Sequence, residues 1–297
     1  MTTHIVADDT LGTISRRMWE VQRRLLEGTL DPSLVAKNLQ SIVEATEVSL
    51  APLEQMSPFF ADEEVKSNYG YPQGYAVCSI LEQLLKLAPH FPNLDPEPTL
   101  KLYQQLPDLS SFIPETWMGR DVRRWVNWYI VPRRERVANT ENEAVEKVID
   151  LIGKTRTFSN HHKGNLGPKY LRLSERTAIA LQIIGDKQKG DFLLIPAQFG
   201  LTHRGRSVRR VRVVYAPNEF GLGSFIAGCM ILSHPERLVQ WEQLRIDCPG
   251  DEYSPGADGD FSLAPLFYFY GGGVGFGAGW YSSAYGDYGS ASAFVPA

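Results

Sequence analysis

The sequence predicts an α+β fold: a helical N-terminal two-thirds, followed by a small, mostly antiparallel sheet around a buried helix. Three observations support this prediction. Apolar residues recur at helical spacing in several segments before residue 186. A continuous apolar run begins at Phe192, and the segment 221–232 is apolar almost all round. Two further apolar runs flank the glycines of 271–273, which is typical of a hairpin.

The N-terminal region, 1–114, is expected to hold helices and a proline-rich connector. Capping residues and helical spacing predict helices over 15–27, from Asp31 onward, and over 77–88. Six prolines then fall within 89–114. Proline this dense predicts an ordered connector without a helix, because proline removes a backbone donor and restricts the residue before it.

The C-terminal domain is expected to span 115–297 and to begin with helices. An apolar and aromatic stripe over 122–130 predicts the first of them. Thr140 and Glu143 form a capping box that begins a second helix. A third helix is expected over 174–185.

The remainder is expected to form the sheet and its buried helix. Residues 192–195 predict a strand buried on both faces. Valines and arginines alternate over 208–215, which predicts a strand with a basic face. The buried helix is expected over 221–232, and Ser233 begins another that extends to about Leu244.

The hairpin has an unusual face. In its second strand, 274–280, Gly275, Gly277 and Gly279 lie on one side. This face predicts either tight packing within the protein or a shelf for a flat ligand or a neighbouring subunit, which would make the protein self-associate. The last segment, 282–297, is interpreted as a final strand or a loose tail.

Composition excludes several classes of protein. The chain has 297 residues, with 30 basic and 34 acidic side chains and a net charge of −4. This balance disfavours a dedicated nucleic-acid binder. We expect no membrane segment or signal peptide, because no apolar run approaches the length that either requires. Three cysteines without a CxxC pair predict a soluble protein of the reducing cytoplasm.

An arginine-rich run is the leading candidate for a binding site. Guanidinium groups form forked hydrogen bonds to carboxylates and phosphates, and a histidine beside them can titrate. The leading hypothesis is a cytosolic binding module for an anionic ligand or an acidic partner surface. Its expected ligand-binding residues are His203, Arg206, Arg209, Arg210 and Arg212. The alternative is a charged face paired within the protein to Asp247, Asp251 or Glu252.

An acidic loop is the candidate metal site. Carboxylates on a glycine-bearing loop can coordinate calcium or magnesium, although the spacing is not that of the helix-loop-helix calcium motif. The candidate ligands are Asp247, Asp251, Glu252, Asp258 and Asp260. With Arg209 or Arg210 binding the substrate, this loop would make the protein a metal-assisted hydrolase or transferase. The alternative is a solvated turn or a partner for the arginines.

Other catalytic motifs are missing from the sequence. It contains no GxSxG, HExxH or GxxxxGK[ST] pattern, and no cysteine stands in a recognisable nucleophile motif with a histidine. Whether the protein is an enzyme is therefore not decided by motifs.

Several segments carry a resemblance. They are Gly164-Asn165-Leu166-Gly167-Pro168-Lys169-Tyr170, Ile195-Pro196-Ala197-Gln198-Phe199-Gly200, Asn218-Glu219-Phe220-Gly221-Leu222-Gly223 and Asp247-Cys248-Pro249-Gly250-Asp251-Glu252. On these segments the chain, from Glu143 onward, resembles an uncharacterised protein family of candidate-phylum bacteria. The resemblance implies a cytosolic bacterial protein and supplies no activity.

Overall fold

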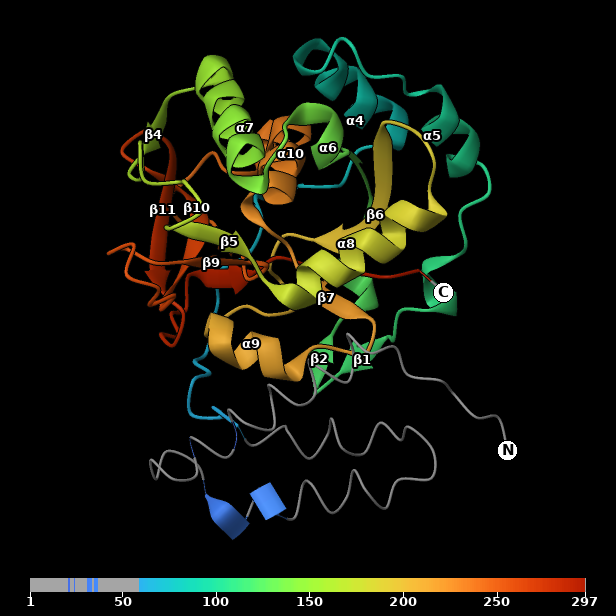
Figure 1. Ribbon diagram of the computed structural model, residues 1–297. Helices are drawn as coiled ribbons and strands as arrows, with labels where there is room; N and C mark the ends of the chain where they lie inside the picture. Colours follow the sequence, from blue (N-terminus) through green and yellow to red (C-terminus); the bar gives the residue numbers. More distant parts are fainter. Residues whose placement is uncertain (1–20, 22–23, 25–30, 34, 37–58, 297) are drawn as a thin grey trace. The chain divides into compact units, whose positions relative to one another are not determined.

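The computed structural model describes residues 21, 24, 31–33, 35–36 and 59–296 (Figure 1). The chain divides into two compact units, Met1–Gln55 and Met56–Ala297. In the first unit the Ser33 N–H donates to Asp31 Oδ1 at 2.8 Å, which is the capping contact expected of Asp31. The described residues 21, 24, 32–33 and 35–36 are helical, and the remaining residues of the two helices expected there lie outside the described ones.

The described helices of the second unit alternate with strands along the chain. They are α4 (Ile80–Leu87), α5 (Glu97–Tyr103), α6 (Arg134–Val137), α7 (Glu141–Thr155), α8 (Glu175–Lys187), α9 (Val208–Val214) and α10 (Ser224–Ser233). Four short 3-10 turns are η1 (Ala88–His90), η2 (Leu109–Ser111), η3 (Arg123–Trp125) and η4 (Pro235–Arg237).

The strands form three sheets in the described part of the chain. The first pairs β1 (Thr116–Trp117) with β2 (Arg120–Asp121). The second has the order β3-β6-β13-β7, built from β3 (Asn127–Pro132), β6 (Phe192–Gln198), β13 (Ser292–Phe294) and β7 (Glu219–Gly221). The largest has the order β12-β8-β10-β11-β4, from β12 (Tyr288–Ser290), β8 (Arg245–Asp247), β10 (Leu263–Tyr270), β11 (Gly273–Trp280) and β4 (Phe158–Asn160). Strand β9 (Asp251–Tyr253) joins it through β10, and β5 (Leu171–Leu173) pairs with β9.

The protein is α+β, yet the predicted helical N-terminal two-thirds is wrong. Strands β1 to β6 all lie before residue 199 and are interspersed with helices, although most of the sheet is in the C-terminal half. The segment 122–130 illustrates the reason. It forms a 3-10 turn and then β3, which pairs antiparallel with β6 from Asn127 to Pro132. Its aromatic and β-branched residues favour a strand, and the pairing of β3 with β6 outweighs the helical spacing of its apolar residues.

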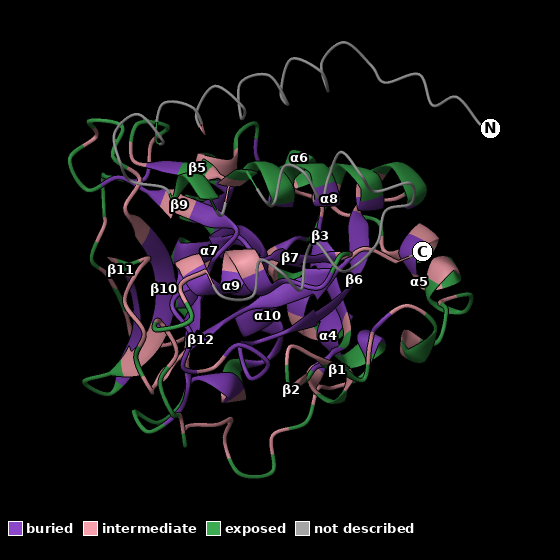
Figure 2. Cartoon of the chain, turned by 90° about the horizontal axis from the view of Figure 1, so that it is seen from below, coloured by how far each residue is buried: buried purple, intermediate pink, exposed green. Residues whose placement is uncertain are grey.

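Helix α10 is the centre of the core, as the sequence predicted for 221–232. All of its residues are buried, and it contacts α4, α7 and β3 (Figure 2). Its contact with α7 is close at Gly228. A Cβ on that glycine would lie 2.8 Å from Val148 Cγ1, so only hydrogen fits between the two helices.

Replacing Gly228 by alanine is therefore expected to lower the free energy of unfolding by about 1 to 3 kcal/mol, the usual cost of overpacking a core. Urea denaturation measures this change. The double variant with Val148→Ala should be less destabilised than the sum of the two single variants, because the smaller side chain relieves the contact. Strict additivity would show that Gly228 and Val148 do not compete for space.

Three other predictions about local structure need correction. The expected strand over 208–215 is the helix α9, because Ser207 Oγ accepts from the Arg210 N–H and the valines at positions 208, 211 and 214 are buried together on one side. The helix expected after Ser233 is only the turn η4. The connector 89–114 does contain a helix, α5, in which Pro98 occupies the first turn, where a missing N–H costs nothing.

The glycine face of the hairpin is covered from within. Strands β10 and β11 pair as predicted, with Tyr268 directly opposite Gly275. The Tyr268 ring lies over the glycines: a Cβ on Gly275 would be 2.6 Å from it, and one on Gly277 would be 3.3 Å away. The geometry matches the interpretation of tight internal packing for these two positions. The segment after 282 contributes β12 and β13.

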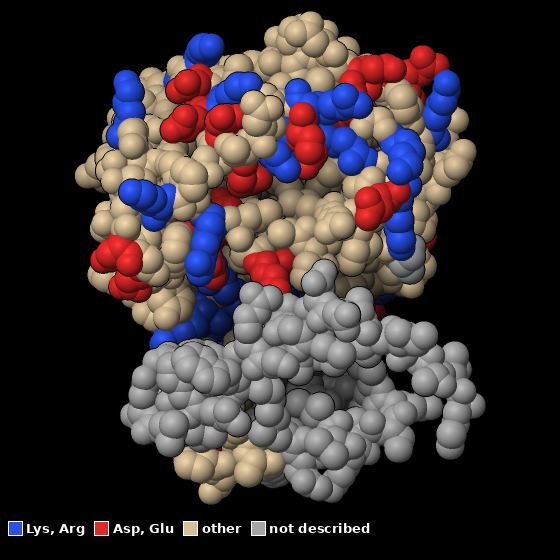
Figure 3. Space-filling view, viewed as in Figure 1, with Lys and Arg blue, Asp and Glu red and all other residues tan. Residues whose placement is uncertain are grey.

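The surface carries charges of both signs. On the face shown in Figure 3, Lys and Arg side chains are interspersed with Asp and Glu. No helix among the described residues combines the length and the apolar character needed to cross a bilayer.

Candidate functional site

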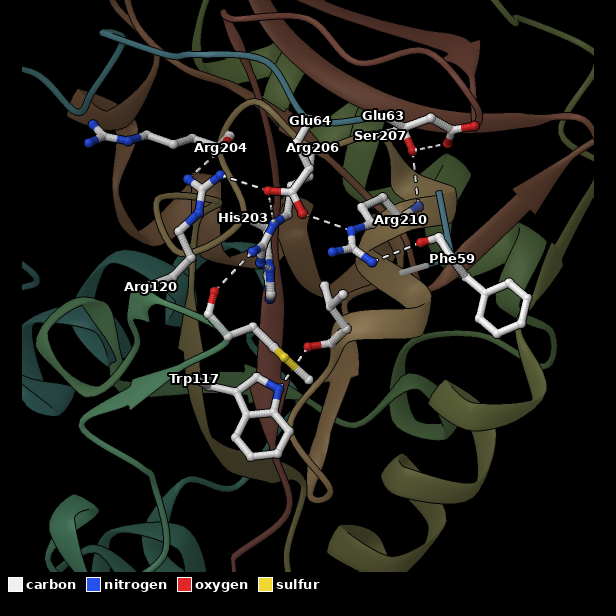
Figure 4. Close-up of polar contacts among 12 residues, drawn as sticks. Phe59, Glu63, Glu64, Trp117, Arg120, His203, Arg204, Arg206, Ser207 and Arg210 are labelled. Atoms are coloured by element: carbon white, nitrogen blue, oxygen red, sulfur yellow. Dashed lines mark hydrogen bonds and ion pairs between the residues drawn. The ribbon is translucent and has the colours of Figure 1, made fainter. Parts of the chain in front are cut away.

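The arginine run lies on α9 and the turn before it, not on a strand. A single carboxylate, that of Glu64, lies among three guanidinium groups (Figure 4). Arg210 Nε lies 2.7 Å from Glu64 Oε1. Arg206 Nε and Arg120 Nη2 lie 3.1 and 3.2 Å from Oε2. Burial by itself raises the pKa of Glu64, but the guanidinium groups of Arg210, Arg206 and Arg120 overcome it and hold the pKa at about 2.

Backbone contacts fix the segment that carries Glu64. The Val65 N–H donates to the Gly205 carbonyl at 2.7 Å, and the Ser207 N–H donates to the Glu63 carbonyl at 3.1 Å. Gly205 has a φ of 74° and lies directly against the Val65 carbonyl, where no side chain would fit. An acidic stretch of the protein's own chain therefore occupies the arginine cluster.

The other predicted binding residues also have partners. Arg209 forms an ion pair with Glu63. Arg212 donates to the Asp251 carbonyl at 2.8 Å and lies 3.4 Å from Glu252 Oε1, which is one of the internal pairings that the sequence suggested.

His203 is buried with a carboxylate partner. Its Nε2 lies 2.7 Å from Glu219 Oε1, and both side chains are buried. Ser292 Oγ donates to the same oxygen at 2.6 Å, and the Ala216 N–H donates to Oε2 at 3.0 Å. Burial raises the pKa of Glu219, but His203 and these donors lower it below its usual range. These contacts give His203 a structural role in the protein interior.

The five acidic candidates are distributed over separate strands and a loop. Asp247 ends β8, Asp251 and Glu252 lie in β9, and Asp258 and Asp260 follow in the loop before β10. Glu252 lies 2.7 Å from Arg172 Nε. Asp258 accepts from the Asp260 N–H at 3.0 Å within its own turn. Within the described ranges, no three His, Cys, Asp or Glu side chains gather in a way that would hold a metal ion.

A pocket of about 540 Å³ opens between the beginning of α7, helix α8 and the beginning of α10. Leu173 and Phe225 give it apolar walls, and Arg134 and Gln182 add polar groups. Glu141, the first residue of α7, also lines it. Its carboxylate forms no hydrogen bond or ion pair with any residue that the structure describes. It is thus available to a molecule in the pocket.

A second carboxylate lies behind the pocket wall. Asp251 is fully buried, and its Oδ2 accepts from the Ser224 N–H, the first amide of α10, at 2.6 Å. Its Oδ1 has no hydrogen-bond partner in the described part of the protein. A Cβ on Gly223, which lines the pocket, would lie 2.8 Å from that oxygen. The glycine therefore lets the carboxylate approach the pocket.

The two carboxyl groups perturb each other. Burial, with the Asp251 charge second, raises the pKa of Glu141 to about 8, against the opposing charge of Arg134. Burial also raises the pKa of Asp251, to about 6, although bonds from Ser224 favour its charged form. The negative charge of Asp251 opposes a second negative charge on Glu141, so Glu141 keeps its proton near neutral pH.

Sequence patterns did not identify this pair. Asp251 was a candidate as a metal ligand, while Glu141 had no candidate role. A glutamate in the first turn of a helix is ordinary, because it complements the helix dipole. No local pattern shows that position 141 faces a pocket with a second carboxylate behind it.

Comparisons of the chain with protein-family models, with curated proteins and with solved structures found no match.

Proposed function

We propose that the protein binds a small molecule in the Glu141 pocket and that Glu141 donates a proton to an acceptor atom of that molecule. The observation that supports this most is the Glu141 carboxyl at the pocket, which has no bonding partner among the described residues, with the buried carboxylate of Asp251 behind it. Concave sites that combine apolar walls, a few polar groups and perturbed carboxyl groups are typical of ligand and active sites.

The chemistry follows from the charges. At neutral pH the protonated Glu141 presents an O–H to the pocket, and the ionised Asp251 stays fixed by the Ser224 amide. An acceptor such as a carbonyl oxygen would take a hydrogen bond from Glu141, or its proton in a general-acid step. Losing that proton would add a negative charge that the Asp251 charge opposes, and this repulsion favours reprotonation of Glu141.

Ligand-observed NMR with a library of small carbonyl-containing fragments tests the proposal. Fragments are expected to bind at pH 6.5 and to lose about tenfold in affinity at pH 9.5, because the ionised Glu141 no longer donates and about 1.4 kcal/mol of hydrogen-bond energy is lost. Ala178→Trp on α8 should abolish binding by filling the pocket that Ala178 lines.

The matched control is Ile179→Trp, which places the same ring on the same helix at a residue that is 51% exposed and does not line the pocket. It should leave binding unchanged. Fragments that bind Ala178→Trp as well as wild type, or no binding at either pH, would refute the proposal.

The arginine cluster supports a second and narrower candidate function, the binding of acidic segments. The observation in its favour is that three guanidinium groups share one carboxylate of a short acidic segment. An external anionic ligand or acidic partner surface would have to displace Glu63 and Glu64. Salt titration of binding to nucleotides, RNA and acidic peptides tests this idea, and absent or salt-insensitive binding would end it.

A further inference from the structure

Cys78 and His234 lie together although 156 positions separate them in the sequence. Cys78 Sγ is 3.4 Å from His234 Nε2, and the Cys78 N–H donates to the same nitrogen at 3.3 Å. On the other side of the ring, Nδ1 lies 3.2 Å from the Met230 carbonyl, which can only accept. This network assigns the proton to Nδ1, so the lone pair of Nε2 is shared between the Cys78 N–H and the thiol.

Aromatic rings hold the imidazole in this orientation. The rings of Tyr129, Tyr75 and Phe199 surround it, with centroids 5.1, 6.1 and 6.1 Å away. Burial lowers the pKa of His234 to about 4, so the ring is neutral at physiological pH and no proton occupies Nε2. A fixed base with its lone pair on a thiol is the arrangement found in activated cysteine nucleophiles.

Cys78 is the least buried of the three cysteines and has a cation near its thiol. Cys78 is half-buried and immediately precedes Ser79, which caps α4, whereas Cys229 and Cys248 are fully buried. Lys86 Nζ lies 3.7 Å from Sγ and would stabilise a thiolate. Burial raises the pKa of the Cys78 thiol, with Lys86 opposing it, so the resting pair is neutral and reaction requires proton transfer to the histidine.

We propose that Cys78 and His234 form a nucleophile–base pair that reacts with small electrophiles carrying a leaving group on carbon. The Sγ–C bond forms while the bond from carbon to the leaving group breaks, and the leaving group departs with its electron pair. The thiol proton passes to His234 Nε2 and then to solvent. This site goes beyond the proposed function, because neither residue lines the Glu141 pocket.

Alkylation by iodoacetamide, followed residue by residue with peptide mass spectrometry, tests the proposal. The Cys78 rate is expected to stay nearly constant from pH 5.5 to 7.5, since proton transfer within a neutral pair consumes no hydroxide. A thiol without a neighbouring base would react about tenfold more slowly for each unit by which the pH falls. The charged side chains facing the pair are Lys86, Glu82 and Glu236. Burial raises the pKa of the Tyr75 and Tyr129 phenols, so these rings stay neutral there.

Two substitutions test whether His234 acts as the base for Cys78. His234→Gln should slow Cys78 alkylation at pH 6 by about tenfold or more and restore the steep pH dependence. His161→Gln, on the exposed loop after β4, is the matched control and should change nothing. Cys229 and Cys248 serve as internal reporters of folding, because they react only if the protein opens.

A wild-type rate that rises tenfold per pH unit would overturn the proposal without any variant. A His234→Gln protein with protected Cys229 and Cys248 and an unchanged Cys78 rate would also overturn it.

Discussion

Replacing Glu141 by glutamine is expected to raise the free energy of unfolding by about 2 to 3 kcal/mol at pH 9. The pKa of Glu141 is raised from an ordinary value of 4.5 to about 8 in the folded protein. One pKa unit corresponds to about 1.4 kcal/mol. Because the side chain is partly exposed, the expected cost is smaller than the full pKa shift would give. Glutamine has the shape of the protonated acid and does not ionise, so it avoids this cost.

The sign of the pH dependence follows from linkage. Below pH 4.5 the acid is protonated in both the folded and the unfolded chain, and the two proteins should be equally stable. As the pH rises towards 8, the unfolded chain releases the proton and the folded protein does not. The stability that Glu141 gives the wild type is thus complete below pH 4.5 and is lost by about pH 8.

Urea denaturation of both proteins at pH 4.5, 7 and 9 measures the effect. Glu146→Gln, on an exposed position of the same helix, is the control and should show little change at any pH. A Glu141→Gln protein less stable than wild type at pH 9, or a difference that does not grow with pH, would contradict the assignment of a protonated Glu141. Because a residue that costs stability is expected at a functional site, agreement would support the pocket as well.

The sequence predicted well those elements whose evidence lies within a few residues. Thr140 was predicted to cap the helix now seen as α7, and its hydroxyl oxygen accepts from the Glu143 N–H at 3.2 Å. The apolar segment 221–232 was predicted to be a buried helix, and α10 is buried throughout. Caps and fully apolar segments are local properties, so one sequence is sufficient to find them.

Contacts between distant residues could not be predicted in the same way. The charge of Asp251 affects Glu141 because α7 and β9 both reach the beginning of α10, and no local pattern around either residue predicts this arrangement. Similarly, the sequence suggested Asp247, Asp251 or Glu252 as partners for the arginines. The main partners, Glu63 and Glu64, come from a segment more than a hundred residues away.

The alternation of valine and arginine over 208–215 shows how local evidence can mislead. A period of two places Val211 and Val213 on one face, as a strand would. A period of three places Val208, Val211 and Val214 on one face, as a helix does. The Ser207 cap belongs to the helix, and the contacts of Arg206 and Arg210 with Glu64 lie at its beginning.

Glu64→Gln is expected to have the opposite effect to Glu141→Gln, lowering the free energy of unfolding by about 2 to 3 kcal/mol at pH 7. Here the folded pKa is depressed from 4.5 to about 2, so the carboxylate contributes stability above pH 4.5 and loses it as the pH falls towards 2. A neutral amide would remove the negative charge that the guanidinium groups of Arg120, Arg206 and Arg210 share at this position.

Urea denaturation of Glu64→Gln measures this contribution. The control is Asp62→Asn, at an exposed position two residues earlier. The loss should shrink as the pH is lowered from 4.5, because the wild type then loses the same charge. Equal stability of the two variants at pH 7 would contradict this prediction. It would mean that solvent screens the charges of the three arginines and that the Glu64 charge does not help to hold its segment against α9. The same type of substitution thus separates a carboxyl group that stabilises the fold from one that the fold holds at a cost.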